Sequence, residues 1–196
     1  MSLGLQRCSL CRKQGSSLGC CEACARQLFR AQHYPKGVYL GSYEGQLKRA
    51  VRSFKFHGVT RLAEVFAREL ALELSKTDHT LDLLCPVPLH WTRYLQRGYN
   101  QSALIAKALS RRTDIPVETL RRTKRTRQQA LLSAAERHSN VADAFVAENV
   151  RGRRIALIDD VITTGATMEA CEAALLEAGA RSVLWLSITA QVGGSS

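Results

Sequence analysis

Apolar residues recur along this chain in two alternating patterns: short continuous runs, and longer stretches with helical spacing. The runs predict strands at residues 38–43, 81–89, 116–120, 144–147, 155–158 and 182–189. The longer stretches predict helices at residues 47–54, 62–74, 98–112 and 167–178, the last ending before Gly179. Strands that alternate with helices predict an α/β fold with an open, mainly parallel, twisted sheet, in which ligands bind at the carboxyl ends of the strands.

The first 35 residues lack this periodicity and are rich in Cys, Gly and Ser. A segment of that size and composition cannot fold on hydrophobic burial alone. We therefore expect a small N-terminal domain at residues 1–35, a main domain at residues 36–192 and a disordered tail at residues 193–196.

Five of the seven cysteines fall within residues 8–24. Two Cys-x-x-Cys pairs offer four thiolates in two turns, which is the spacing of a closed tetrahedral zinc site: Cys8, Cys11, Cys21 and Cys24. Closed coordination leaves no open position, so the zinc is expected to be structural. A redox role for either pair is the weaker alternative, and Cys20 is a spare thiol or an alternative ligand.

The predicted strand at residues 155–158 is followed at once by Asp159 and Asp160, and then by small residues that enter a helix. Backbone N–H groups at such a turn can approach a phosphate, and the helix dipole favours the anion. The carboxylates are suited to ribose hydroxyls or to a magnesium shell. We expect these residues to bind a sugar phosphate: Asp159, Asp160, Val161, Thr163, Thr164, Gly165, Ala166 and Thr167.

Two other phosphate-binding motifs are excluded because the residues they require are absent from this segment. A Walker loop requires a lysine before its Ser or Thr, and a dinucleotide-binding fingerprint requires G-x-G-x-x-G; this segment has neither. An ordinary buried strand followed by a capped helix is the remaining alternative. The adjacent acid pair and the TTGAT run weigh against it.

The segment IALIDDVITTGAT at residues 155–167 resembles the signature of type I phosphoribosyltransferases. More specifically, the chain resembles the ComF family of competence proteins over nearly its whole length. The resemblance rests on the four-cysteine segment, SFKFHG, PVPLHWTRYLQRGYNQ, scattered residues between 126 and 145, and the phosphate loop. It implies that phosphoribosyl pyrophosphate (PRPP) binds with Mg²⁺, that Asp159 and Asp160 are the catalytic acid pair, and that the Thr/Gly turn holds the 5′-phosphate.

The resemblance also implies a pyrophosphate loop after the strand at residues 81–89, and a basic lid at residues 121–145. The expected pyrophosphate contacts are Leu89, His90, Arg93, Arg97, Arg125, Arg127 and Arg137. A solvated or DNA-facing surface is an equally weighted alternative for Arg93 and Arg97. We do not assign His90 a catalytic role, because a lone histidine next to a tryptophan is more often packed or hydrogen-bonded. No role follows for Lys55.

Lys and Arg outnumber Asp and Glu by 28 to 17, for a net charge of +11, which favours anionic partners. Residues 107–127 hold eight basic residues against two acidic ones. The expected nucleic-acid contacts are Arg121, Arg122, Lys124, Arg125 and Arg127. Aromatic residues suited to stacking on single-stranded DNA are Phe54, Phe56, Trp91, Tyr94 and Tyr99. Alternatively, these aromatics are core and the basic cluster serves PRPP alone.

Two functions remain open from the sequence. The resemblance favours a PRPP-binding protein of DNA uptake in natural transformation, with single-stranded DNA, a competence helicase and recombination-mediator proteins as partners, and a peripheral association with the uptake machinery. The alternative is a metabolic enzyme that transfers ribose 5-phosphate from PRPP to a nucleobase or related acceptor. No leader and no run of about 20 apolar residues is found, so we expect a soluble cytoplasmic protein.

Overall fold

The computed structural model describes residues 6–8, 11, 13–16, 21, 23–24, 28–34, 36–89, 91–122, 145–146 and 149–190. Its centre is a five-stranded sheet in the order β3-β4-β9-β8-β5. The strands are β3 (Gln32–Tyr34), β4 (Gly37–Tyr39), β5 (Leu83–Pro86), β8 (Arg154–Ile162) and β9 (Ser182–Ala190). All neighbours run parallel except β3 and β4. The predicted open, mainly parallel sheet is therefore confirmed.

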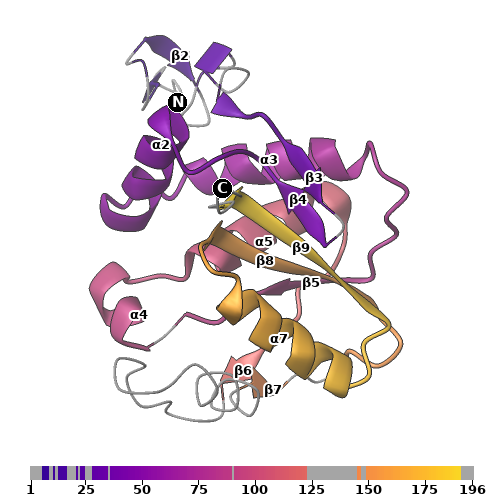
Figure 1. The fold of residues 1–196 in the computed structure, drawn as a ribbon. Coiled ribbons are helices and arrows are strands. Elements are labelled where there is room, and N and C mark those ends of the chain that lie inside the picture. The colour runs from indigo at the N-terminus through magenta and orange to yellow at the C-terminus, as the bar shows by residue number, and fades with distance from the viewer. Residues whose placement is uncertain are drawn as a thin grey trace, which may run out of the picture.

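Helices cover both faces of the sheet (Figure 1). On one face lie α2 (Gly45–Phe56), α3 (Leu62–Leu74) and α5 (Gln101–Thr113); α7 (Ala166–Glu177) lies on the other. Alternate residues of β8 serve the two cores: Ala156 and Ile158 pack with α2, α3 and α5, whereas Ile155 and Leu157 pack with α7. This period of two follows from the pleat of a strand that is buried on both sides.

Several predicted elements match in position and type. Helix α7 ends where predicted, because Gly179 takes a φ of +93° and Ala180 N–H donates to the Leu175 carbonyl at 3.0 Å. A break between α2 and α3 occurs at Gly58, whose φ is +65°. Strand β5 lies within the predicted residues 81–89 but ends earlier, at Pro86, a residue without an N–H donor.

Three other predicted strands differ more from the structure. Strand β8 does not stop at residue 158 but continues through the acid pair to Ile162. Residues 116–120 contribute only an isolated bridge between Leu84 and Val117. The next backbone donors on either side of this bridge would be Pro86 and Pro116, and neither has an N–H with which to extend the pairing. The strand at residues 144–147 is the two-residue β7 (Phe145–Val146), which pairs with β6 (Arg121–Arg122) outside the main sheet.

The N-terminal segment contributes a two-stranded ribbon, β1 (Gln6–Arg7) and β2 (Gln14–Ser16). Strand β3 falls within the stretch predicted as the small domain, but it pairs with β4 of the main sheet. Among the described residues, no helix is both long enough and apolar enough to cross a membrane. The tail at residues 193–196 lies outside the described residues.

Candidate functional site

The two carboxylates of the candidate site lie near the end of β8, between β5 and β9. Asp160 is 6% exposed, and its Oδ1 lies 2.9 Å from the Lys55 Nζ. The Oδ1 of Asp159 accepts hydrogen bonds from the Ser102 hydroxyl at 2.9 Å and from the Asp160 N–H at 2.8 Å. Helices α2 and α5 therefore hold the acid pair from the same side of the sheet.

Burial and, second, the neighbouring negative charge of Asp160 together raise the pKa of the Asp159 carboxyl to about 7. The hydrogen bonds from Ser102 and from the Asp160 N–H, together with the Lys55 charge, act in the opposite direction. A carboxyl with a pKa in this range exchanges a proton near neutral pH. Perturbed groups of this kind cluster at functional sites.

Sequence analysis assigned no role to Lys55 or Ser102, which both contact the acid pair. Lys55 lies in α2 one turn after Val51, at the margin of the buried stripe formed by Leu47, Ala50, Val51 and Phe54. Its side chain is 15% exposed. The sequence did contain a signal for this role: a lysine placed at helical spacing along an apolar stripe. A lysine that is buried in this way requires an anionic partner for its ammonium group.

The small-residue turn leads from β8 into the N-terminus of α7. Gly165 is the N-cap residue, with a φ of +82°, and no described side chain caps the helix. The side chains of Thr163, Thr164 and Thr167 are exposed, and the Ala166 N–H points to the Thr164 Oγ1 at 3.4 Å. The start of α7 therefore has no side-chain cap from Gly165 and lies next to several exposed hydroxyls, an arrangement that suits a phosphate.

The loop after β5 is tied to the start of α5. The Asn100 side chain accepts from the Ser102 N–H at 3.0 Å, and its Nδ2 donates to the Val87 carbonyl at 3.0 Å. The short helix α4 (Trp91–Arg97) follows the loop and carries both predicted arginines. Arg93 is exposed, whereas Arg97 is half-buried and donates from Nη1 to the Gln101 Oε1 at 3.2 Å.

Several residues with predicted roles lie outside the described residues: Cys20, His90, Lys124, Arg125, Arg127 and Arg137. The backbones of Arg121 and Arg122 form β6, but their side chains are not described. Upstream in the same basic cluster, Arg111 and Arg112 both pair with Glu64 of α3. Part of the cluster's charge is therefore balanced within the fold.

The side chain of Trp91 is not among those that the structure describes, and the other four aromatic residues predicted to stack on DNA divide into two groups. Phe54 is fully buried in the core, and the half-buried Tyr99 donates its hydroxyl to the Phe54 carbonyl. Phe56 and Tyr94 are 63% and 53% exposed. The core alternative therefore holds for Phe54, whereas Phe56 and Tyr94 remain accessible.

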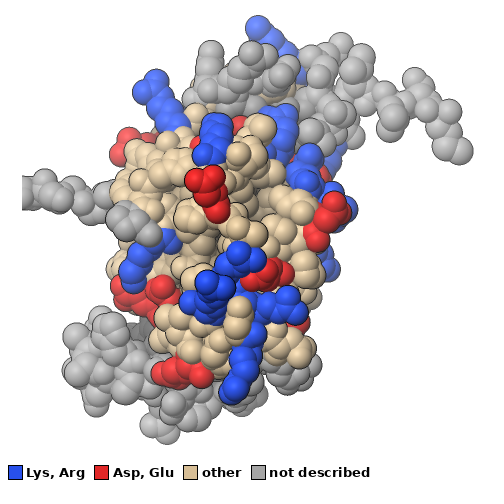
Figure 2. Space-filling view, turned by 90° about the vertical axis from the view of Figure 1, so that its right-hand side faces the viewer, with Lys and Arg blue, Asp and Glu red and all other residues tan. Residues whose placement is uncertain are grey.

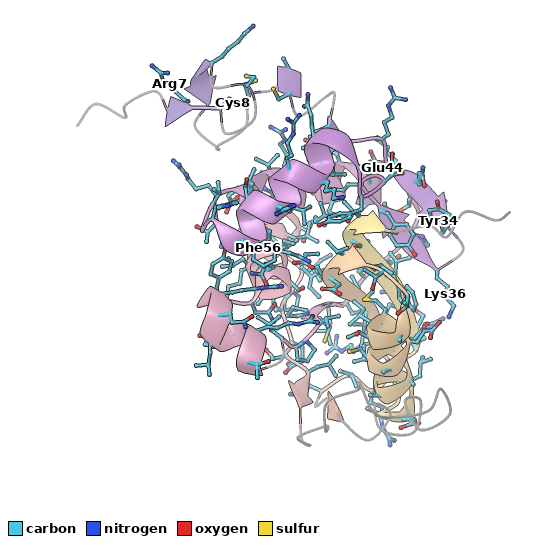
Figure 3. The ribbon with its side chains drawn as sticks, turned by 60° about the vertical axis from the view of Figure 1, so that its left-hand side comes forward. Arg7, Cys8, Tyr34, Lys36, Glu44 and Phe56 are labelled. Atoms are coloured by element: carbon cyan, nitrogen blue, oxygen red, sulfur yellow. The ribbon has the colours of Figure 1, made fainter. Side chains whose placement is uncertain are left out.

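Four cysteine sulfurs, from Cys8, Cys11, Cys21 and Cys24, lie within 4.8 Å of one another. The Cys11 and Cys21 sulfurs are 3.7 Å apart, close to the roughly 3.8 Å edge of a tetrahedron with Zn–S bonds of about 2.3 Å. Burial, with hydrogen bonds among the crowded thiols, raises the pKa of Cys24 when no cation is bound. The cluster is compatible with a structural zinc; Figure 3 shows Cys8 beside the N-terminal ribbon.

Comparisons with known proteins agree with this geometry. The model of the phosphoribosyl transferase domain matches residues 100–189. Adenine phosphoribosyltransferase from Leishmania tarentolae superposes with a TM-score of 0.54, covering 83% of this chain and 95% of that one, at 10% identity. At that identity the likeness shows the fold alone, which is the type I phosphoribosyltransferase fold.

Two relatives are closer in sequence. Competence protein F of Haemophilus influenzae is 36% identical over 90% of this chain and 86% of its own length. DNA utilization protein YhgH of Escherichia coli O157:H7 is 34% identical over 82% of this chain and 74% of its own length. The chain therefore belongs to the ComF family of competence and DNA utilization proteins, built on a phosphoribosyltransferase domain.

Proposed function

We propose that the chain binds PRPP at the end of β8 and uses this site in DNA uptake during natural transformation. The observation that carries the proposal is the juxtaposition of a buried acid pair with the open N-terminus of α7. Asp160 is 6% exposed, yet its Oδ2 has no hydrogen-bond partner among the described residues, so a carboxylate oxygen is left for a ligand.

Each part of PRPP has a suitable counterpart in this arrangement. The ribose hydroxyls donate to Asp159 and Asp160, and the 5′-phosphate accepts from the turn at residues 163–167. Pyrophosphate faces Leu89, His90, Arg93 and Arg97, and the lid supplies Arg125, Arg127 and Arg137. Mg²⁺, when bound, neutralises part of the pyrophosphate charge.

Calorimetric titration of PRPP with Mg²⁺ tests this site. Asp159→Asn with Asp160→Asn is expected to weaken binding about ten-fold or more, because an amide replaces each charged acceptor of a ribose hydrogen bond. The matched control is Asp78→Asn, since Asp78 is an exposed acid outside the site. Equal affinity in wild type and the double variant would refute the proposed site.

A role in DNA handling rests on the relatives' names and on charge. Competence protein F and DNA utilization protein YhgH each match more than four-fifths of the chain, and the net charge is +11. On the face shown in Figure 2, Lys and Arg lie among Asp and Glu. The predicted DNA contact is a run of basic residues in the sequence with no acidic residue between them: Arg121, Arg122, Lys124, Arg125 and Arg127. The helicase and mediator partners, the cytoplasmic location and the peripheral contact with the uptake machinery belong to this proposal.

Salt dependence tests DNA binding, because each phosphate that is neutralised on single-stranded DNA contributes about 0.7 to the slope of log K against log salt. Changing these five basic residues to Ala is expected to lower the slope by about 2 or more. Changing Arg111 and Arg112 to Ala is the control, since Glu64 already pairs with both. An unchanged slope in the five-residue variant would rule out these contacts.

The second candidate function is ribosyl transfer to a nucleobase or related acceptor. It is favoured by the cavity beside the acid pair, whose lining includes Lys55 and Arg97. In that reaction the bond from ribose C1 to pyrophosphate breaks, and the acceptor nitrogen forms the new bond and loses its proton. An acceptor screen that measures pyrophosphate release tests it: release that needs one acceptor and vanishes in Asp159→Asn/Asp160→Asn supports transfer.

A further inference from the structure

A lysine from the helix layer is held against the acid pair of β8. The Lys55 Nζ lies 2.9 Å from the Asp160 Oδ1, and the two side chains are 15% and 8% exposed. Figure 3 marks this end of α2 by Phe56, the residue that follows Lys55. Because solvent screens such a buried ion pair only weakly, the ammonium acts as a fixed positive charge beside Asp160.

Core packing fixes the backbone from which Lys55 extends. Helix α2 buries one stripe of apolar side chains: Leu47, Ala50, Val51 and Phe54. Just before α5, the Tyr99 hydroxyl donates a hydrogen bond to the Phe54 carbonyl, the residue next to Lys55. The fold therefore places the lysine against Asp160, unlike a lysine in an exposed ion pair, whose position is set by the side chain alone.

Each carboxylate of the acid pair already has a donor on one oxygen. The Asp160 Oδ1 faces Lys55, and the Asp159 Oδ1 accepts from the Ser102 hydroxyl at 2.9 Å and from the Asp160 N–H at 2.8 Å. The Asp160 Oδ2 is buried and has no hydrogen-bond partner among the described residues. A ligand at this oxygen therefore meets a carboxylate whose charge is already balanced.

Two kinds of ligand suit carboxylates in this position, a sugar hydroxyl and a divalent cation. Magnesium binds proteins through the charge of one or two carboxylates, and here it would lie beside the Lys55 ammonium in a site that solvent reaches poorly. The two positive charges would repel each other. A ribose hydroxyl carries no charge, so it can donate to the Asp160 Oδ2 while the ammonium stays on Oδ1.

We propose that Lys55 takes the place of a divalent cation at the acid pair, so that Asp159 and Asp160 bind ribose hydroxyls directly and exclude Mg²⁺. Lys55 is a positioning residue, because it acts on the sugar through Asp160. The inference rests on the proposed PRPP site for the identity of the sugar. Any Mg²⁺ that accompanies PRPP then stays on the pyrophosphate, away from Asp160.

Mn²⁺ tests the exclusion, because it prefers the same oxygen ligands as Mg²⁺ and its free form is measured by electron paramagnetic resonance. It is titrated into the full chain without sugar. Wild type and Asp159→Asn/Asp160→Asn are expected to bind Mn²⁺ equally. Lys55→Gln is expected to bind it at least about ten-fold more tightly than wild type, and addition of Asp160→Asn removes this gain. Lys36→Gln, which removes the 59% exposed lysine that pairs with Glu172, is the control without a gain.

Ribose 5-phosphate tests the counter-charge, by calorimetry with and without Mg²⁺. Wild type is expected to bind it equally under both conditions. Lys55→Gln is expected to bind it about five-fold or more weakly without Mg²⁺ and to recover with Mg²⁺, because the cation then balances Asp160. Lys55→Arg keeps the charge and follows the wild type. A merely structural role of the lysine would weaken binding equally under both conditions.

Either of two results overturns the proposal: tighter Mn²⁺ binding by wild type than by Asp159→Asn/Asp160→Asn, or no gain of Mn²⁺ in Lys55→Gln. The first comparison leaves Lys55 unchanged, so it decides even if Lys55→Gln does not fold. The Mn²⁺ titration contains no sugar. Failure of ribose 5-phosphate to bind any of these proteins would therefore refute the PRPP site, while the Mn²⁺ results still decide whether Lys55 excludes cations.

Discussion

At the scale of single residues, the ion pair between Lys55 and Asp160 neutralises one negative charge of the acid pair. The side chains of Lys55 and Asp160 are 15% and 8% exposed, so solvent screens their 2.9 Å contact only weakly. Removal of one partner leaves the other charge buried without compensation, which costs more than the loss of an exposed pair.

Lys55→Gln is therefore expected to lower the free energy of unfolding by about 3 kcal/mol. Lys36→Gln is the matched control: Lys36 is 59% exposed in its pair with Glu172, and its loss is expected to cost less than about 1 kcal/mol. Urea unfolding measures both. Adding Asp160→Asn to Lys55→Gln should cost less than the sum of the single changes; additivity within about 0.5 kcal/mol would contradict the coupling.

Asp159 gives the site a pH dependence. Its pKa rises from 3.8 to about 7 through burial and the charge of Asp160, so the folded chain holds a proton that the unfolded chain has released across that interval. This contribution to stability is complete below pH 3.8 and is lost as the pH rises to about 7. Asp159→Asn has no such proton. Its stability relative to wild type is therefore expected to increase between these pH values, measured by urea unfolding; a constant difference would contradict the raised pKa.

At the scale of elements, the start of α5 fastens the loop after β5 to the helix layer. Asn100 caps α5 through the N–H groups of Ser102 and Ala103, at 3.0 and 3.4 Å. The same side chain donates to the Val87 carbonyl at 3.0 Å. One residue therefore sets both where the helix begins and where the predicted pyrophosphate loop lies.

Asn100→Ala is expected to lower the free energy of unfolding by about 1–2 kcal/mol, because it removes the cap and the bond to the loop. Asn100→Asp keeps the cap acceptors but has no donor for the Val87 carbonyl. It is expected to retain most of the stability while binding pyrophosphate more weakly. Urea unfolding and pyrophosphate titration separate the two effects. Equal losses of stability in both variants would show that the cap is not the main contribution.

The sequence was sufficient to predict the end of an element where a residue type marks it. Helix α7, for example, ends just before Gly179, which takes a positive φ. It was insufficient where pairing between strands determines an end. Strand β8 passes through its acid pair because Asp159 still pairs with Ser187 and Ile162 with Ala190 on β9. The main-chain hydrogen bonds of a strand do not depend on the polarity of its side chains. The end of the apolar run at residue 158 therefore predicted too early an end for the strand.

The candidate site was predictable to the extent that it lies in one segment. Asp159, Asp160 and the turn that follows are adjacent in the sequence, and the structure keeps them together. Lys55, Ser102 and Arg97 come from three other helices, so only the fold brings them to the acid pair or the cavity beside it. Their roles depend on tertiary contacts that no local spacing encodes.

At the scale of the whole molecule, the N-terminal cysteine cluster is continuous with the main core. Cys8, Cys24 and Leu28 belong to the same buried cluster as Phe66 of α3. The ring of Phe29 also packs edge-on against that of Phe66, with 6.1 Å between centres. Loss of a cysteine from this cluster is therefore expected to destabilise the packing of α3 against the main sheet.

Cys11→Ser is expected to lower the zinc content from about one ion per chain to near zero, because three thiolates bind zinc much more weakly than four. It is also expected to lower the free energy of unfolding of the whole chain. Cys85→Ser is the control, since Cys85 is a buried core thiol away from the cluster. Atomic emission measures the metal. Unchanged zinc in Cys11→Ser, or zinc loss in Cys85→Ser, would contradict the assignment.

The central claim is that the acid pair of β8 binds the ribose of a 5-phosphoribosyl group. The most direct measurement compares the affinities of ribose 5-phosphate and pyrophosphate for wild type and for Asp159→Asn/Asp160→Asn by calorimetry. The predicted result is a loss of about ten-fold or more for ribose 5-phosphate, with pyrophosphate binding retained, because only the sugar donates to these carboxylates. Equal affinity of ribose 5-phosphate for both proteins would contradict the claim.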